Sequence, residues 1–420
     1  MPRARFPWFP TALLLSLFAL PRPASADLPD IGQPVLCQRC DVLLILLPGL
    51  RADSVTPDRM PRLSQWIAAR RAVKFNNAIS PSSWYLPAAT TILTGLPPSQ
   101  HKVFNEVAFQ GGAPRDLPAD VTLPAVLRGA GYRTAAFAAT GTNESHFALD
   151  RGFDSYEAFT RDATLDELGP KALEWARQDG GKPWMITLLS FQAQGWRSPF
   201  GLSTGAAKKW KDLRHLTMAQ TLFGLEPAEI AGLRTYHDEL LRETDRQLGA
   251  LLEPLSRKMI VIIASTNGEE FGEHGGMDHG QTLYDEAIRV PLLLALPTTT
   301  HWRDQNHQLS LREIGPMILD YAGIHKSLGP EVAAFNRIDM VQGTGMDEPV
   351  PSMTDYLGVA HLSSLRSTDG WKLIVDRASG RKQLFNVIED PREERDRFAE
   401  REDLARSYGA QLDLLQSQRP

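Results

Sequence analysis

Cysteine is almost absent from this sequence, with two residues, Cys37 and Cys40, among 420. A zinc site built on this cysteine pair is not favoured, because it lacks a second pair of ligands. A redox role for the CxxC pair is not favoured, because such motifs usually follow a strand and open a helix. We predict a local disulfide that closes a small loop before the first strand, while pairing to another chain stays open.

Runs of basic residues and long apolar segments are also missing. The net charge is −5 and no lysine- or arginine-rich run occurs, so nothing favours nucleic acid as a partner. Beyond the N-terminal region, no stretch is long and apolar enough to predict a transmembrane helix. With 42% hydrophobic residues, the chain can build one large domain and a smaller one.

The first residues have the pattern of a targeting segment. Arg3 and Arg5 precede the apolar run TALLLSLFAL (11–20), and the small residues ASA end at Ala26. We predict a signal peptide over residues 1–26, cleaved near Ala26, with export to the periplasm or the exterior. An uncleaved membrane anchor is disfavoured by the short apolar run and the small-residue site.

Short apolar runs alternate with amphipathic stretches along the next 300 residues or so. Alternation of this kind is typical of an α/β protein with a largely parallel sheet and helices on both faces. In the stretch 86–95, Pro87 near the first helical position and Gly95 as the stop predict a helix. The expected strands are 42–47, 72–80, 184–191, 258–265 and 290–296, and other expected helices are 60–71 and 233–255; 122–139 is expected to form a helix, a glycine turn and a strand.

The residue pattern of the sequence changes past residue 340. WKLIVD (371–376) and KQLFNV (382–387) flank a glycine turn and predict a hairpin, and 401–418 predicts a closing amphipathic helix. The fold class is therefore α/β, a large parallel-type mixed sheet flanked by helices with a small C-terminal α+β subdomain. The expected parts are an N-terminal segment at 27–40, an α/β domain at 41–340 and a C-terminal subdomain at 341–420.

Five segments of the sequence, 80–103, 151–159, 235–252, 265–297 and 365–393, carry motifs that occur together in a fixed order. With these motifs the chain resembles the sulfatase family of the alkaline-phosphatase-like superfamily. The resemblance runs over nearly the whole mature chain and implies that family's fold. It also implies hydrolysis of sulfate or phosphate esters with a calcium or magnesium ion.

The metal-ligand positions that the resemblance assigns are mostly not carboxylates. The family's two aspartates at the end of the first strand correspond to Pro48 and Gly49, and its next aspartate corresponds to Thr266. Asn267 alone matches a permitted ligand. A hard cation wants about six oxygen ligands, so we expect no metal at these positions.

The catalytic positions also depart from the family pattern. The nucleophile position holds Tyr85, which cannot become formylglycine, and the arginine position holds Ala89. His279 matches the family's lysine or histidine, and the substrate histidine expected after 184–191 is missing. A shift of register to Ser83 would detach the nucleophile from the helix start, where backbone N–H groups meet an anion.

Several other polar and aromatic residues have two interpretations. Trp84 and Tyr85 either fill the pocket by aromatic packing or stack on a sugar, and Asn267 and His279 are the other candidate binding residues. A polar cluster is either a relocated metal site or a solvated loop, and we favour the loop. The cluster comprises Glu269, Glu270, His274, Asp278 and His279, and Lys208, Lys209 and Lys211 are expected to be a solvated face.

The preferred functional hypothesis is an exported, catalytically inactive pseudo-hydrolase that acts in binding or scaffolding. Its expected partners are a sulfated or phosphorylated glycan or an active enzyme. One alternative is an active sulfuric-ester or phosphate-ester hydrolase with a rebuilt site, using the 269–279 cluster and Tyr85 or a nearby serine. Another is a subunit that only stabilises a catalytic homologue.

Overall fold

The computed structural model describes most of the chain between residues 37 and 417, and these residues belong to one compact unit that spans 34–420. The predicted signal peptide, the boundary near residue 340 and the lysines at 208–211 lie outside the described residues. No helix within the described ranges combines the length and the apolar character needed to cross a membrane. The described residues are 37, 39–104, 121–141, 149–178, 181–194, 227–256, 258–297, 304–326, 328 and 347–417.

An eight-stranded sheet forms the centre, in the order β10-β2-β9-β6-β1-β5-β3-β4. Its middle strands are continuous apolar runs buried on both faces, which is why they occupy the core of a largely parallel sheet. In this sheet only β9 runs antiparallel to its neighbours. The strands are β1 (Asp41–Leu46), β2 (Val73–Ile79), β3 (Arg133–Ala138), β4 (Ser155–Ala158), β5 (Trp184–Leu189), β6 (Met259–Ala264), β9 (Arg289–Ala295) and β10 (Gln305–Ser310).

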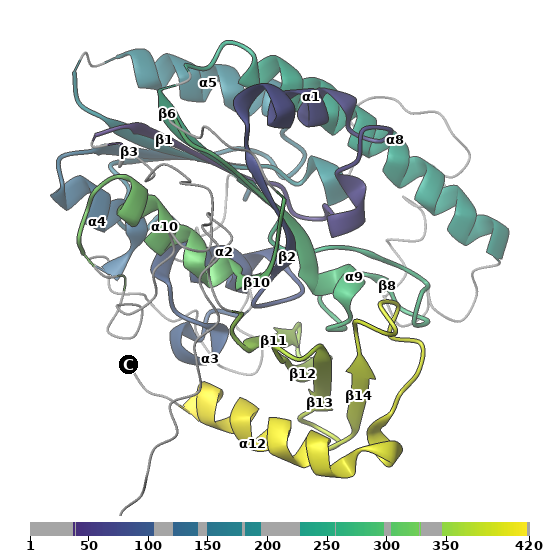
Figure 1. Cartoon of the computed structure of the whole chain (residues 1–420). Helices are drawn as coiled ribbons and strands as arrows, with labels where there is room; N and C mark the ends of the chain where they lie inside the picture. The colour runs from purple at the N-terminus through teal and green to yellow at the C-terminus, as the bar shows by residue number, and fades with distance from the viewer. Residues whose placement is uncertain are drawn as a thin grey trace, which may run out of the picture. The chain divides into compact units, whose positions relative to one another are not determined.

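Helices cover both faces of this sheet (Figure 1). One face carries α1 (Pro61–Arg70), α5 (Leu165–Arg177) and α8 (Pro227–Leu252), which pack on one another. The other face carries α2 (Tyr85–Thr94), α4 (Leu123–Gly129) and α10 (Ile314–Tyr321). Together with the C-terminal subdomain, this arrangement confirms the predicted fold class.

Helix α2 begins earlier than predicted. Its first residue is Tyr85, and Pro87 is the third helical residue rather than one near the first position. A proline is tolerated there because the N–H groups of the first turn have no partner within the helix. Gly95 ends the helix with φ +70°, as predicted, because a left-handed stop favours glycine.

The C-terminal part forms a second, antiparallel sheet of four strands with one helix against it (Figure 1). The predicted hairpin and closing helix are confirmed. Three hydrogen bonds tie β11 to the main domain: Met353 N–H to Pro81 O at 2.9 Å, Ser352 Oγ to Ser80 O at 2.7 Å, and Thr354 Oγ1 to Gly280 O at 2.7 Å. The elements are β11 (Val350–Tyr356), β12 (Ala360–Arg366), β13 (Trp371–Asp376), β14 (Lys382–Asn386) and α12 (Glu402–Ser417).

A disulfide joins Cys37 and Cys40 directly before β1, which confirms the predicted local pairing. The Cys37 N–H donates to Tyr321 O at 2.9 Å, so the loop is attached to the end of α10. The bridge therefore fixes the entry of the chain into the central strand.

Candidate functional site

The carboxyl ends of β1 and β6 bring the predicted metal-ligand positions together. The Gly49 N–H donates to Asn267 O at 2.9 Å. Ser80, at the end of β2, donates its hydroxyl to Thr266 O at 2.5 Å. This edge of an α/β sheet is where ligands usually bind, so the fold places Pro48, Gly49, Thr266 and Asn267 where the resemblance implies.

The space beside Gly49 is filled by the side chain of Gln194. A Cβ built on Gly49 would lie 2.6 Å from Gln194 Cγ and 3.1 Å from its Cα, and the glycine has φ +89°. Gln194 comes from the short 3-10 helix Gln192–Gln194 that follows β5 and is only 4% exposed. On α8, His237 hydrogen-bonds the Gly49 backbone, and burial lowers its pKa to about 4, so its ring is neutral.

Both ends of the Asn267 amide are hydrogen-bonded to neighbouring protein groups. Its Oδ1 accepts from Thr266 Oγ1 at 3.0 Å and from Gln194 Nε2 at 3.4 Å, and its Nδ2 donates to Gly268 O at 2.9 Å. Pro48 and Gly49 offer no side-chain oxygen at all. The residues at these positions therefore do not fit a calcium or magnesium ion, which requires several oxygen ligands that converge.

Tyr85 and Trp84 are packed against protein. Tyr85 is 2% exposed and Trp84 is 4% exposed. The Tyr85 ring meets Phe191 edge-on with centroids 4.6 Å apart, and Trp84 meets Tyr356 at 5.1 Å. Rings this closely packed contribute to the core, and neither one presents an open face.

Ala89 is buried in α2 and offers no functional group. An arginine that the sequence analysis did not identify lies near the nucleophile position instead. The Arg161 guanidinium is 5.3 Å from the centre of the Tyr85 ring and 5.2 Å from that of Phe191. Residues Arg161, Phe191 and Gln194 carry no local motif, so only the tertiary structure reveals them.

His279 belongs to a buried group with two carboxylates. Its Nδ1 lies 2.5 Å from Asp278 Oδ1 and 3.4 Å from Glu269 Oε1. Burial opposes a charged ring, but the two carboxylates outweigh it and raise the pKa of His279 to about 10. Burial raises the pKa of Glu269 to about 8 in spite of the nearby imidazolium. Asp278 has φ +74°, a conformation uncommon outside glycine that is found at functional sites.

The interpretation of the cluster as a solvated loop is wrong for Glu269, Glu270, Asp278 and His279, which are buried, whereas the turn at 272–276 between them is partly exposed. Glu269, Glu270 and His279 are 2%, 1% and 2% exposed, because the segment is enclosed by neighbours from α8, α9 (Asp285–Ile288) and the C-terminal part. The segment forms two short strands, β7 (Glu270–Phe271) and β8 (Met277–Asp278). Two carboxylate–histidine groups result, Glu269–Asp278–His279 and Glu270–His274–Glu286.

A buried ion cluster holds this region against the C-terminal sheet. The Lys372 ammonium lies 2.9 Å from Asp285 Oδ1 and 2.8 Å from Glu393 Oε1, and all three side chains are buried. Burial raises the pKa of Glu393 to about 7, although Lys372 opposes the shift. The pKa of Asp285 is lowered, since Lys372 and Arg366 together outweigh its burial.

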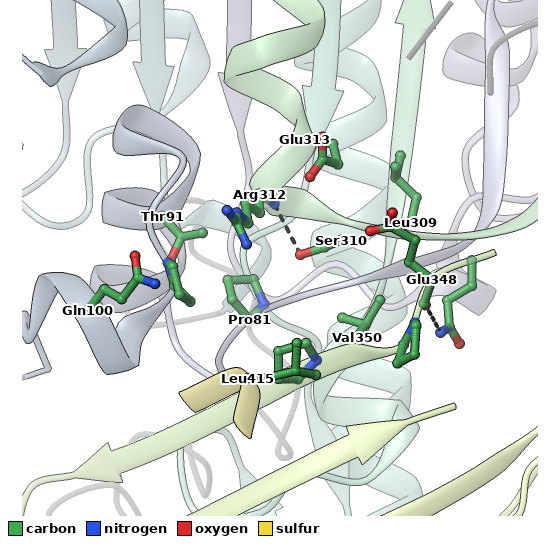
Figure 2. Close-up of a pocket in the computed structure, with 14 residues that line it drawn as sticks. Pro81, Thr91, Gln100, Leu309, Ser310, Arg312, Glu313, Glu348, Val350 and Leu415 are labelled. Carbon is green, nitrogen blue, oxygen red and sulfur yellow. Dashed lines mark hydrogen bonds between the residues drawn. The ribbon is translucent and has the colours of Figure 1, made fainter. Parts of the chain in front are cut away.

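Figure 2 shows the residues that line a cavity between α2, the end of β10 and the C-terminal part. The volume of this cavity is about 100 Å³. Arg312 lies over it and donates from Nε to Gly95 O at 2.8 Å, so its charge is fixed to the end of α2. A larger cavity of about 540 Å³ lies near Arg51 and Glu286. Neither of these two cavities is lined by Tyr85, Thr266 or Asn267.

The fold is a large α/β sheet flanked by helices with a small antiparallel C-terminal sheet, and the strand-end positions meet at one edge of the large sheet. The family model for sulfatases matches residues 41–324, and the chain belongs to the sulfatase family. Arylsulfatase K of Mus musculus is 29% identical over 181 residues, which cover 39% of this chain and 32% of the mouse protein. The match thus spans about a third of the length of the curated relatives.

Solved structures share the architecture at low identity. The phosphonate monoester hydrolase of Agrobacterium radiobacter superposes with a TM-score of 0.69 at 17% identity, covering 90% of this chain and 96% of that one. Another solved protein, in complex with its substrate D-glucosamine-2-N,6-O-disulfate, superposes with a TM-score of 0.67 at 15% identity. The superposition covers 90% of this chain and 98% of that one. At such identities the likeness establishes the fold alone.

Proposed function

We propose that this protein is an exported member of the sulfatase family that no longer performs metal-dependent ester hydrolysis and acts by binding or scaffolding. The hydrolytic reaction of the family builds negative charge on ester oxygens, and a ligated divalent cation offsets that charge. Without the cation and an activated nucleophile, the same fold retains a stable core that can present a binding surface.

The observation that carries the proposal is the position of Gln194. Its side chain takes up the space that a carboxylate at residue 49 would need, and its amide engages Asn267. The substitution at Gly49 is thus compensated by packing, as expected where a cavity has been refilled rather than left open. The buried ring of Tyr85 fits the same interpretation.

The ligand class we propose is a sulfated glycan. The solved neighbour with a disulfated glucosamine in its site supports this class by analogy of fold. A phosphorylated glycan would share the anionic ester chemistry and is the competing outcome. An active partner enzyme is the other candidate, and co-purification with a catalytic homologue would identify it.

The decisive experiment combines turnover with binding on one purified sample. Aryl sulfate and aryl phosphate esters are offered with added Ca²⁺ or Mg²⁺, and we expect no turnover above the metal-only background. Calorimetry then compares a sulfated oligosaccharide with its desulfated and phosphorylated forms, and we expect binding of the sulfated form. Turnover at enzyme-like rates would overturn the proposal. N-terminal sequencing of secreted protein tests cleavage near Ala26.

A second candidate function is ester hydrolysis at a rebuilt site. The buried Glu269–Asp278–His279 group favours it, because a histidine held between two carboxylates can serve in acid–base chemistry. In that case turnover would be present in the native protein and would be lost in Glu269→Ala, His279→Ala or Tyr85→Phe.

A further inference from the structure

The group Glu270–His274–Glu286 differs from the group around His279 in the hydrogen-bond partners of its side chains. Glu270 opens β7, His274 lies in the turn before β8, and Glu286 is the second residue of α9. One ligand atom from each of these residues lies within 4.8 Å of the other two. The three side chains, from β7, the turn before β8 and α9, thus converge at a place distinct from the strand-end positions around Gly49.

His274 is oriented as metal-binding histidines usually are. Its Nε2 lies 3.0 Å from Arg392 O and 3.2 Å from Glu393 O. Carbonyl oxygens only accept, so Nε2 carries a proton and Nδ1 is the atom that faces Glu286, at 2.5 Å. The ring also stacks on Tyr284 with centroids 3.6 Å apart. A ligating imidazole typically donates its other N–H to a carbonyl in this way.

Glu270 supplies a buried oxygen with nothing to bind. The side chain is 1% exposed, and its Oε2 accepts from Thr282 Oγ1 at 2.6 Å. Among the residues that the structure describes, its buried Oε1 has no hydrogen-bond partner, which is costly for a polar atom. A Cβ on Gly276 would lie 2.7 Å from both Glu270 oxygens, so glycine alone leaves the carboxylate its room.

The group also has a path to solvent. Glu286 lines the 540 Å³ cavity, where carboxylates outnumber arginines by five to four. In contrast, His279 and Glu269 in the neighbouring group are 2% and 3% exposed at their side chains. The cavity is lined by Asp53, Glu273, Asp285, Glu286 and Glu394 and by Arg51, Arg234, Arg289 and Arg392.

We propose that Glu270, His274 and Glu286 bind one divalent transition-metal ion, with zinc as the favoured metal. One imidazole and two carboxylates are a donor set that zinc accepts, and three protein ligands leave a fourth position toward the cavity. Calcium and magnesium prefer an all-oxygen shell, so this site differs in chemistry as well as position from the one that the family resemblance implies.

The test is a zinc titration of untagged, chelator-treated protein by calorimetry, with metal analysis of the product. We expect one zinc per chain, and we expect Glu270→Gln to weaken the affinity ~100-fold or more, since even outer-shell changes cost 10- to 100-fold. Glu269→Gln, the adjacent glutamate of the other group, is the matched control and should bind zinc like the native chain.

Failure to bind zinc stoichiometrically would overturn the site, as would retained affinity in Glu270→Gln or lost affinity in Glu269→Gln. If Glu270→Gln does not fold, nitrogen-15 NMR of the native protein still decides, because zinc must shift the Nδ1 resonance of His274. The inference goes beyond the proposed function and fails separately from it. Bound zinc without ester turnover supports both, whereas zinc-dependent turnover would overturn only the inactivity.

Discussion

The side chain of Gln194 occupies the position that a side chain on Gly49 would take, with Cγ 2.6 Å from the place of the missing Cβ. Glycine also suits this position because its φ is +89°. The glycine at the position that the family resemblance assigns to an aspartate is thus packed against a glutamine from the segment after β5.

Gly49→Ala should lower the free energy of unfolding by about 3 kcal/mol in the native background. The left-handed conformation costs about 1–2 kcal/mol for alanine, and the contact with Gln194 adds to it. In a Gln194→Ala background the loss should shrink by about 1 kcal/mol, a coupling typical of neighbours. Urea denaturation of the native protein, the two single variants and the double variant completes this double-mutant cycle. Equal losses of stability in both backgrounds would contradict the coupling.

Tyr85→Ala should destabilise the protein by about 3–5 kcal/mol, because the ring is buried against Phe191 and Trp84 and its removal leaves a cavity. Tyr85→Phe keeps the ring and should cost about 1 kcal/mol, the scale of one hydrogen bond. Val359→Ala, at a residue 71% exposed, is the control and should be nearly neutral. A loss under about 1 kcal/mol for Tyr85→Ala would mean that the ring faces an open pocket.

Lys372→Met should cost about 3–5 kcal/mol, since it leaves Glu393 buried without its cation and removes the nearest cation from Asp285, which keeps only the arginines at 3.5 Å. The double variant Lys372→Met/Glu393→Gln should be more stable than Lys372→Met alone, because it no longer buries an uncompensated carboxylate at residue 393. Arg395→Met removes an exposed ion pair with Glu400 and should have no measurable effect. Thermal unfolding midpoints of these variants measure their relative stabilities. An unchanged midpoint in Lys372→Met would contradict a structural role for the cluster.

The elements that the sequence predicted correctly are those with local causes. The strand at β1 follows from an uninterrupted apolar run, and the end of α2 follows from Gly95. The antiparallel direction of β9 was not specified by the sequence analysis, because a buried strand has the same apolar pattern in either direction. The start of α2 was misplaced because Pro87 is tolerated at more than one position of the first turn.

The candidate site was predicted less completely, because its decisive neighbours are distant in the chain. The structure brings Gly49 and Asn267 together at the ends of β1 and β6, but no local pattern marks Gln194 as the residue that fills the space beside Gly49. Likewise, the burial of Glu269 and Glu270 depends on packing against α8, α9 and the C-terminal part. A polar stretch with two glycine turns has the composition of a solvated loop, and only long-range packing makes it an interior segment.

The buried glutamates and histidines make the stability of this protein depend on pH. Burial raises the pKa of Glu269 to about 8 and that of Glu270 to about 7, so the folded chain binds more protons than the unfolded chain above pH 4.5. Stability therefore falls as pH rises through that range. His274 and His279 have pKa values raised to about 9 and 10 by carboxylates that outweigh burial. Their contribution is complete below pH 6.5 and is lost as pH rises toward 10, so the sign is the same.

The native protein should therefore be more stable at pH 5.5 than at pH 9, with the urea midpoint as the measurement. Each full proton of difference changes the free energy by about 1.4 kcal/mol per pH unit. Glu269→Gln should flatten the profile between pH 5 and 8, because glutamine cannot lose the proton that the folded glutamate retains. Glu174→Gln, on the exposed side of α5, should leave the slope unchanged. A midpoint that rises from pH 5.5 to pH 9 would contradict this prediction, because the buried histidines with lowered pKa values, His101 at about 3 and His237 at about 4, favour folding with rising pH only up to about pH 6.5.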